Sequence, residues 1–446
     1  MFSPFQFLLL VLFAFTTLIS CVPSPSRHGP TQILGLGVPI SNSDAKSIIP
    51  NRYIVVYHND ATDKEVKTHQ ASVMSSLRRR SLERRTLDGR VLSNEMNTFS
   101  MMGWRGMALE ADDGMILEIA SERMVSFIEA DTMVKTNALV VQSSSTAPAG
   151  LRRISHANGL GTGYVFDNSS GSGIVAYVVD TGILLSHSEF AGRAKWGANF
   201  VNSNVSYLEP ELMISRTTPN SKQDTDENGH GSHVSGTIGG TTFGISKSIS
   251  LIAVKVLDAA GTGSTSNLIL GLQFVATNAT ALKLSGKAVV NLSIGGSKST
   301  AMNNAIAAVT RAGVLVVCAA GNENVDAGTT SPASAREAVT VGAIDSATDA
   351  KASFSNFGEV VDVWAPGVRV QSVGITSNTA SAILSGTSMA SPHVAGLAAY
   401  LMALEKITTP AAVAARILEL AGSTGAKATG VGRGTTTLIA YNGDGL

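Results

Sequence analysis

The chain has 446 residues, 44% of them hydrophobic, and its 33 basic and 33 acidic side chains give a formal net charge of zero. A chain of this length can bury more than one hydrophobic core, and the balanced charge excludes the strongly basic character of a nucleic-acid-binding protein. We therefore expect a globular protein that has no nucleic acid as a partner.

The first predicted element is a short apolar segment. Residues 5–19 are apolar except for Gln6 and two threonines. This run is short for a membrane span and has the length of the apolar part of a signal peptide, although no lysine or arginine precedes it. We predict that residues 1–20 are a signal peptide and that the protein is secreted, extracellular rather than vacuolar, with no membrane anchor.

A small module is predicted between about residues 50 and 134. The apolar patterns indicate strand, helix, strand, strand, helix and strand at residues 53–57, 64–77, 98–102, 104–110, 115–123 and 125–129. This order is the split βαβ arrangement of a small α+β, ferredoxin-like domain. The arginine-rich residues 78–90 interrupt it and fit either a solvated loop or a site for a dibasic-specific protease.

The remainder of the chain alternates strands and helices. Short apolar runs predict buried strands at residues 174–179, 251–256, 288–292, 314–318, 339–343 and 360–364. Helices are predicted at residues 266–276 and 301–311, the second with Thr300 as its N-cap and Gly313 as its stop. The pattern predicts an α/β fold with a doubly wound, mostly parallel sheet.

Three segments of this larger part carry residues suited to acyl transfer. Asp180 ends an apolar strand, His230 stands between glycines before a helix, and Ser388 precedes Pro392 and a helix expected at residues 394–404. A hydroxyl is a poor nucleophile near neutral pH, so it needs an imidazole to take its proton and a buried carboxylate to fix the imidazole tautomer. An α/β-hydrolase would show the order Ser, acid, His and a G-x-S-x-G pentapeptide, which does not occur here.

The position of Ser388 has two interpretations. Proline is tolerated in the first turn of a helix, so Ser388 should lie near a helix N-terminus, where N–H groups and the helix dipole favour an oxyanion. Alternatively, Ser388 is only an N-capping serine.

The motifs Asp180-Thr181-Gly182, His230-Gly231-Ser232-His233-Val234 and Gly386-Thr387-Ser388-Met389-Ala390-Ser391-Pro392 resemble the three signatures of the subtilisin family of serine proteases. The likeness is nearest to the fungal proteinase K-like branch. It implies a subtilisin-like endopeptidase that hydrolyses proteins and peptides with broad specificity, with Asp180, His230 and Ser388 as its triad. It also implies that His233 is a structural histidine.

The resemblance extends to the small module. Residues 52–56 and 125–131 resemble the subtilisin propeptide, which is an inhibitor and folding chaperone of its own protease. Residues 134–150 are rich in small and polar side chains and form a linker suited to cleavage. Comparison with fungal relatives favours cleavage between Asn137 and Ala138, which makes residues 21–137 the propeptide and 138–446 the protease; cleavage before Gln142 is the alternative.

The resemblance also implies the remaining parts of the site. Asn322 corresponds to the oxyanion donor, with a turn-forming asparagine as the alternative interpretation. Two chain segments should bind an extended substrate between them as an added strand. Small residues should line the S1 pocket, which should therefore be large and uncharged. The substrate-binding residues implied are Gly261, Thr262, Gly263, Ser293, Ile294, Gly295, Ala319, Ala320 and Gly321.

Other predictions concern modification, metal and assembly. Asn168, Asn204 and Asn278 fit the N-glycosylation pattern. No cofactor is expected for catalysis, but a structural calcium site is implied by resemblance at Arg336, Ala338 and Asp362; alternatively, Asp362 only caps or pairs locally. Of the two cysteines, Cys21 borders the signal peptide, so Cys318 should have no disulfide partner in a mature, monomeric enzyme.

Two other functions fit the sequence less well than a protease does. A catalytically silent subtilisin fold that serves as a binding protein would be expected to lack a triad residue or Asn322, and all four are present. An esterase with another substrate is disfavoured by the order of the motifs and by the two peptide-binding segments.

Overall fold

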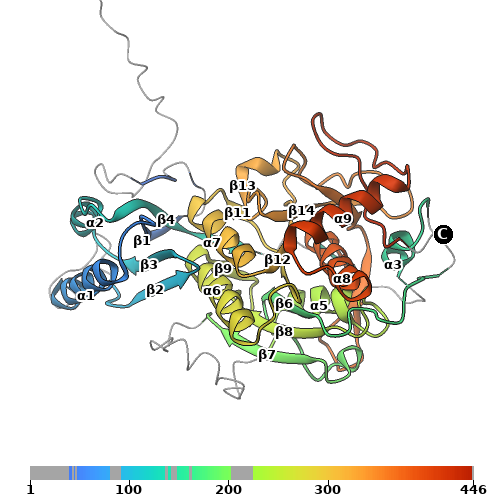
Figure 1. Cartoon of the computed structure of the whole chain (residues 1–446), viewed down its shortest axis with the longest axis horizontal. Coiled ribbons are helices and arrows are strands. Elements are labelled where there is room, and N and C mark those ends of the chain that lie inside the picture. The colour runs from blue at the N-terminus through green and yellow to red at the C-terminus, as the bar shows by residue number, and fades with distance from the viewer. Residues whose placement is uncertain are drawn as a thin grey trace, which may run out of the picture.

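The computed structural model describes residues 40–42, 45, 48–80, 92–135, 139–141, 148–159, 163–201 and 225–443. The predicted signal peptide, the bond between Asn137 and Ala138, and Asn204 lie outside these residues. In Figure 1 a small module with helices α1 and α2 lies beside a larger module that contains a central parallel sheet.

The small module consists of β1 (Ile48–Tyr57), α1 (Asp63–Arg80), β2 (Met96–Met101), β3 (Trp104–Glu110), α2 (Asp113–Ala120) and β4 (Val125–Lys135). Its strands pair antiparallel in the order β2-β3-β1-β4. This is the predicted β-α-β-β-α-β order. Several boundaries were wrong: β1 begins at Ile48 instead of residue 53, and β4 continues through Lys135 instead of ending at residue 129. Helix α1 continues through Arg80, so Arg78–Arg80 end a helix, and α2 ends three residues before Arg123.

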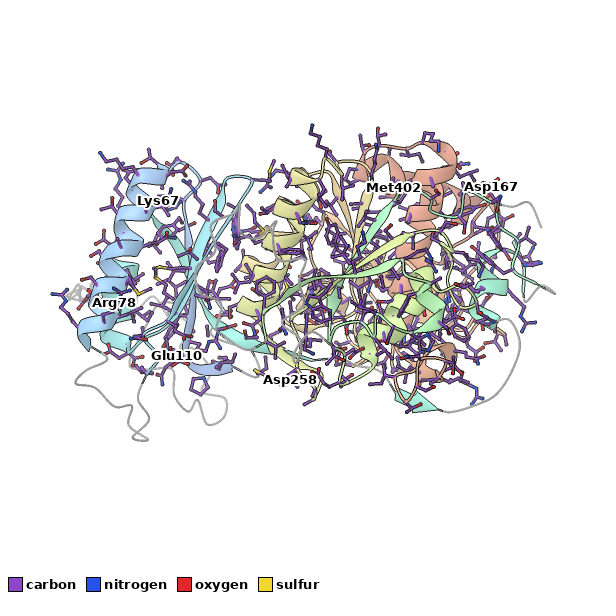
Figure 2. The ribbon with its side chains drawn as sticks, turned by 90° about the horizontal axis from the view of Figure 1, so that it is seen from below. Lys67, Arg78, Glu110, Asp167, Asp258 and Met402 are labelled. Atoms are coloured by element: carbon purple, nitrogen blue, oxygen red, sulfur yellow. The ribbon has the colours of Figure 1, made fainter. Side chains whose placement is uncertain are left out.

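The sheet of the small module packs between its own helices and the larger module. Figure 2 shows Lys67 and Arg78 on α1, at the end of the molecule away from the larger module. On the opposite face, Phe99 and Trp104 belong to the same apolar cluster as residues of helices α6 and α7 of the larger module. This apolar cluster therefore contains residues of both modules.

The larger module is built on seven parallel strands. They are β6 (Val175–Asp180), β7 (Ala194–Asn199), β8 (Ser250–Lys255), β10 (Ala288–Leu292), β12 (Val314–Ala319), β14 (Ala338–Ile344) and β15 (Val363–Pro366), in the order β15-β14-β12-β10-β6-β8-β7. The predicted α/β fold is confirmed. The last predicted strand was placed too early, because residues 358–361 form a turn in which Val361 N donates to Gly358 O.

The strand order positions the site. The chain leaves β6 toward β8 and β7 on one side, and later continues from β10 toward β12, β14 and β15 on the other. In doubly wound sheets a crevice forms at the carboxyl ends of the strands where the winding reverses. Asp180 is the last residue of β6, and Ser293 directly follows β10.

Helices cover the sheet on both faces. They are α3 (Ala149–Ile154), α5 (His230–Gly239), α6 (Thr265–Ala281), α7 (Thr300–Arg311), α8 (Thr387–Glu405) and α9 (Pro410–Ser423), with 3₁₀ turns at Ser188–Phe190 and Ala327–Thr329. The N-cap of α7 is Ser299 rather than the predicted Thr300, because the Ser299 hydroxyl accepts from Met302 N at 3.1 Å. No helix among the described residues is long and apolar enough to cross a membrane.

The helix that carries Ser388 begins earlier than predicted. Helix α8 starts at Thr387, so Pro392 lies inside it rather than in its first turn. A proline inside a helix leaves the carbonyl four residues earlier without its N–H partner. That carbonyl belongs to Ser388, and it accepts a hydrogen bond from the Ser293 hydroxyl at 2.7 Å instead.

Short strands complete the fold. They are β5 (Leu139–Val141), β9 (Thr262–Ser264), β11 (Gly296–Ser297), β13 (Thr330–Ser331), β16 (Val370–Val373) and β17 (Ser381–Ser385). Strand β4 of the small module pairs antiparallel with β9, and β5 pairs antiparallel with β17. The chain is therefore strand-paired with the larger module on both sides of residues 136–138.

Candidate active site

Asp180 and His230 form a buried pair. Asp180 lies at the carboxyl end of β6, and His230 is the first residue of α5. Nδ1 of His230 lies 2.8 Å and 3.0 Å from the two carboxylate oxygens of Asp180. Their side chains are 3% and 0% exposed. This contact fixes the imidazole so that Nδ1 carries a proton and Nε2 can act as a base.

Ser388 is the second residue of α8, and α8 packs against α5. Its hydroxyl donates to Ser293 O at 3.0 Å. In the described part of the chain, His230 Nε2 is buried and has no hydrogen-bond partner. The serine–histidine bond is therefore not made in this conformation, as is common before substrate binds.

Asn322 follows β12 and is oriented by Thr387, the neighbour of Ser388. Its Oδ1 accepts from Thr387 N at 2.8 Å and from the Thr387 hydroxyl at 2.9 Å. The same hydroxyl accepts from Gly321 N at 3.1 Å. These bonds fix the orientation of the Asn322 carboxamide beside the residue that precedes Ser388.

The chain segments predicted to hold substrate lie after β10, at the end of β12 and at the start of β9. Small or apolar residues follow β10 and end β12; among them Ser293, Ile294, Ala319 and Ala320 are buried. Gly261 has a φ of +74°, a conformation that favours glycine, and it leads into β9. β9 is already paired with β4, in the register Val134 to Gly263 and Lys135 to Thr262.

These observations are matched by similarity to known proteins. Residues 171–436 match the sequence model of the subtilase family. The chain belongs to this family. It is 42% identical over 440 residues to subtilisin-like protease 2 of Pseudogymnoascus destructans, covering 99% of both chains, and 41% identical to subtilisin-like protease 6 of Trichophyton tonsurans, covering 89% of this chain and 92% of that protein.

A solved structure supports the same assignment. The crystal structure of a cold-adapted subtilisin-like serine proteinase is 39% identical to this subtilase, with a TM-score of 0.58, and the match covers 67% of this chain and 99% of that one. The protein is therefore a subtilisin-like serine endopeptidase, a hydrolase that acts on protein substrates.

Two further histidines of this subtilase are buried. His233 Nε2 bonds to Val370 O, and His393 Nδ1 bonds to Met389 O. Burial, aided by the nearby His230, lowers the pKa of His233 to about 3, and burial lowers the pKa of His393 to about 4. Both are neutral near pH 7 and bond to backbone, as structural histidines do.

The other predicted positions are dispersed over the subtilase. Asn168 is exposed in a turn, whereas Asn278 is half-buried on α6 and its Oδ1 accepts from the Tyr177 hydroxyl. Cys318 is a free, buried cysteine, and burial raises its pKa to about 12. Such a thiol is unreactive near neutral pH.

The predicted calcium position contains one constrained carboxylate. Asp362 lies before β15, and its Oδ2 accepts from Thr340 N at 2.7 Å. Burial raises the pKa of its carboxyl to about 6. Ala338 is buried at the start of β14, whereas Arg336 is exposed. Among the described residues no group of three or more His, Cys, Asp or Glu could hold a metal, so a cation here would depend on backbone carbonyls.

The sequence predicts Asp180, His230, Ser388 and Asn322 as the reacting groups but gives no role to two contacts that orient them. Thr387 holds Asn322, and Ser293, which was assigned only to the pocket wall, binds both the carbonyl and the hydroxyl of Ser388. The position of Thr387 within the serine motif was the available signal. The contact between Ser293 and Ser388 joins residues 95 apart, and no local pattern indicates it.

Proposed function

We propose that this subtilase is a secreted endopeptidase that is made as a zymogen and first cleaves its own chain, with Asp180, His230 and Ser388 as the triad. The observation that carries the proposal is the buried bond between Asp180 and His230 on α5, which packs against α8, the helix with Ser388 in its first turn. A subtilase needs this pairing to use a serine hydroxyl as its nucleophile.

The proposed reaction begins at Ser388. Its hydroxyl turns from Ser293 O toward His230 Nε2, which takes the proton as Oγ attacks the substrate carbonyl carbon. Asp180, bonded to Nδ1, stabilises the imidazolium that forms. The imidazolium returns the proton to the leaving amine nitrogen as the C–N bond breaks and an acyl-enzyme remains. Water then attacks the acyl group by the same route, which releases the acid and restores Ser388.

Asn322 is proposed to stabilise the tetrahedral intermediate together with the Ser388 N–H. The carbonyl oxygen becomes negatively charged as Ser388 attacks, and donors fixed in advance stabilise that charge without reorganisation. The two bonds from Thr387 to Asn322 Oδ1 support this role, since they fix the carboxamide beside the residue that precedes Ser388. The position of Ser388 in the first turn of α8 adds backbone donors and the positive end of the helix dipole.

Self-cleavage is proposed at the bond between Asn137 and Ala138. Lys135, at the end of β4, pairs with Thr262, and Leu139, at the start of β5, pairs with Ser385, three residues before Ser388. The described residues on either side of the proposed bond are therefore held as added strands, as an extended substrate would be, one on β9 and one on β17. This support favours residue 137 over the alternative before Gln142, which lies beyond β5.

The small module is proposed to inhibit the enzyme until it is degraded. Two carboxylates of β4 reach the N-termini of two helices of the larger module. Glu129 accepts from Thr300 N at 2.7 Å and from the Ser299 hydroxyl at the start of α7, and Asp131 accepts from Ser266 N at 3.1 Å at the start of α6. Burial raises the pKa of both carboxyls. These bonds hold β4 against β9 and so block the edge that a substrate would use.

The S1 pocket is proposed to accept apolar and aromatic P1 side chains. Its walls, residues 293–295 and 319–321, are small or apolar and contain no charged side chain. A charged P1 group would lose its hydration without gaining a partner. Secretion is supported by the apolar residues 5–19. Of the two glycan acceptors that the structure describes, Asn168, exposed in a turn, is better placed than the half-buried Asn278.

Calcium is proposed as a structural ligand at Asp362, with backbone carbonyls of Arg336 and Ala338. The support is a half-buried carboxylate whose pKa burial raises, so that a bound cation would offset the cost of its charge. Calcium would supply stability to the folded chain and take no part in the reaction. We propose that the mature enzyme acts as a monomer.

The function is tested by casein hydrolysis. Purified wild-type protein should degrade casein, and Ser388→Ala should lose about 10⁶ in kcat, the loss known for the triad of subtilisin itself. Near-wild-type hydrolysis by Ser388→Ala would overturn the assignment of the nucleophile. A wild-type protein that folds but leaves both casein and a fluorophosphonate probe unchanged would overturn the proposed activity.

A further inference from the structure

A buried carboxylate that the reaction does not use lies behind the pair of Asp180 and His230. Asp226 is 3% exposed and stands four residues before His230. It accepts five hydrogen bonds from the residues that follow Asp180 or surround His230. The donors are the Thr181 hydroxyl at 2.8 Å, Gly229 N at 2.8 Å, Asn228 N at 3.1 Å, Ser232 N at 2.9 Å and the Ser232 hydroxyl at 2.7 Å.

Two of these donors connect Asp226 to the loop that carries Asp180. Thr181 N donates to Asp180 Oδ1 at 2.7 Å, while the Thr181 hydroxyl donates to Asp226 and accepts from Gly231 N at 2.9 Å. The Ser232 hydroxyl donates to Asp226 and accepts from Leu184 N at 2.9 Å. Asp226 therefore joins the loop after β6 to the first turn of α5 by two separate routes.

The backbones of this loop and this helix are in direct contact. A Cβ atom added at Gly231 would lie 2.2 Å from Gly182 O and 3.1 Å from the Cβ of Asp180. The distance between Asp180 and His230 therefore depends on how closely the loop after β6 packs against the first turn of α5. The five hydrogen bonds to Asp226 fix the position of this loop relative to the helix.

We propose that Asp226 is a positioning residue for the reaction: through Thr181 and Ser232 it sets the geometry of the Asp180–His230 pair. The inference rests on the proposed triad mechanism. Asp226 donates no proton to the substrate and does not contact it. Its effect is on how well His230 Nε2 is aimed at Ser388 Oγ, and so on kcat rather than on substrate binding.

Asp226→Asn tests the proposal, because it keeps the size of the side chain and removes one acceptor. The new amide must face either Ser232 N–H or the three donors at Oδ1, so at least one buried donor loses its partner. A misplacement of catalytic groups by about 1 Å costs about 10²-fold in rate. We expect kcat per active site, counted by complete fluorophosphonate labelling, to fall about 10- to 100-fold, with KM for a peptide substrate within about twofold of wild type.

A second variant keeps the test valid if Asp226→Asn folds poorly. Thr181→Val removes the hydroxyl that links Asp226 to Gly231 and preserves the shape of the side chain. It should lower kcat in the same way, and the double variant should lose little more than either single one, since both changes break one network. Asp345→Asn, which alters a turn carboxylate bonded to Ala347 N, is the matched control and should leave kcat unchanged.

The outcomes separate this proposal from the proposed function. Wild-type kcat in both Asp226→Asn and Thr181→Val, or losses that multiply fully in the double variant, would overturn the positioning role while the enzyme stays active. A rise in KM with unchanged kcat would overturn it too, because it would assign Asp226 to substrate binding. Failure of the wild-type enzyme to cleave the peptide would instead overturn the function itself.

Discussion

At the scale of single residues, hydroxyl side chains hold the reacting groups in place. Thr387 fixes Asn322, and Ser293 replaces the backbone N–H that Pro392 cannot donate to Ser388 O. The Ser293 hydroxyl in turn accepts from Asn291 Nδ2 at 2.8 Å. Asn291 is fully buried, so this amide belongs to the interior network that orients Ser388.

The first prediction concerns Asn322. Asn322→Ala removes the proposed side-chain donor to the oxyanion, so kcat should fall by about 10²–10³ while KM changes little. The steady-state kinetics of peptide hydrolysis provide the measurement. Asn324→Gly, on the same loop, is the matched control, because Asn324 is exposed at a φ of +54° that glycine adopts freely. Equal kinetics in Asn322→Ala and wild type would remove Asn322 from the oxyanion site.

The second prediction concerns Asp362 and pH. Its folded pKa, about 6, exceeds its ordinary value of 3.8, so the folded chain binds this proton more tightly than the unfolded chain does. The resulting stability is fully present below about pH 4 and is lost as pH rises through about 6. In a Ser388→Ala background with EDTA, Asp362→Asn should therefore match the parent at pH 4 and show a Tm several degrees higher at pH 7.5.

Calcium should reduce the difference in Tm between Asp362→Asn and the parent at pH 7.5. Millimolar calcium should raise the Tm of the parent at pH 7.5, by the equivalent of about 2.7 kcal/mol at a hundredfold excess over Kd, and leave Asp362→Asn unchanged. The same Tm for the parent in calcium and in EDTA would exclude the proposed site.

At the scale of elements, strand β4 joins the two modules by helix capping as well as by pairing. Glu129 satisfies donors at the start of α7, and Asp131 does so at the start of α6, where Arg52 lies 3.4 Å from its carboxylate. N-terminal helix donors and the helix dipole both favour a carboxylate at these positions. The edge strand β9 is thereby covered as long as β4 remains attached.

The third prediction follows from this capping. Glu129→Ala leaves Thr300 N and the Ser299 hydroxyl without their acceptor, which costs about 1–3 kcal/mol when the donors stay buried. The inhibition constant of separately produced residues 21–137 against the mature enzyme should rise about 5- to 150-fold. Glu95→Gln, at an exposed position before β2, should leave it within twofold. Unchanged inhibition by the Glu129→Ala propeptide would show that capping contributes nothing to docking.

The fourth prediction concerns the pocket between the ends of β10 and β12. Ile294, Ala319 and Ala320 are buried and offer no counter-charge. Peptides with Phe, Leu or Tyr at P1 should therefore have a higher kcat/KM than peptides with Arg or Asp. A library varied only at P1 measures this directly. Preference for Arg would mean that an acidic group reaches the pocket.

At the scale of the whole molecule, much of the architecture could be predicted from the sequence. Buried parallel strands appear as unbroken apolar runs, which is why both ends of β10 were predicted correctly at residues 288 and 292. The order of strands and helices in the small module was also correct. Asp180, His230 and Ser388 were recognisable because their motifs are local, whereas contacts between distant segments left no local pattern.

The parts that were missed depend on such contacts. Strand β9 is Thr-Gly-Ser and has no apolar pattern, whereas β5 is the apolar Leu-Val-Val but is only three residues long. Each was recognisable only through its pairing with β4 or β17. The start of α8 was missed because the sequence does not reveal that Ser293 would satisfy the carbonyl opposite Pro392. Asp226 was missed because its five donors come from both sides of the site.

The fifth prediction concerns self-cleavage of the linker between the two modules. The central claim is that Ser388 cleaves peptide bonds and that the linker of its own chain is the first substrate. The measurement is mass spectrometry with N-terminal sequencing of wild-type and Ser388→Ala precursors, each expressed alone in a protease-free host. Wild type should yield a chain that begins at Ala138, and Ser388→Ala should keep its propeptide attached. Equal processing of the two precursors would contradict the account.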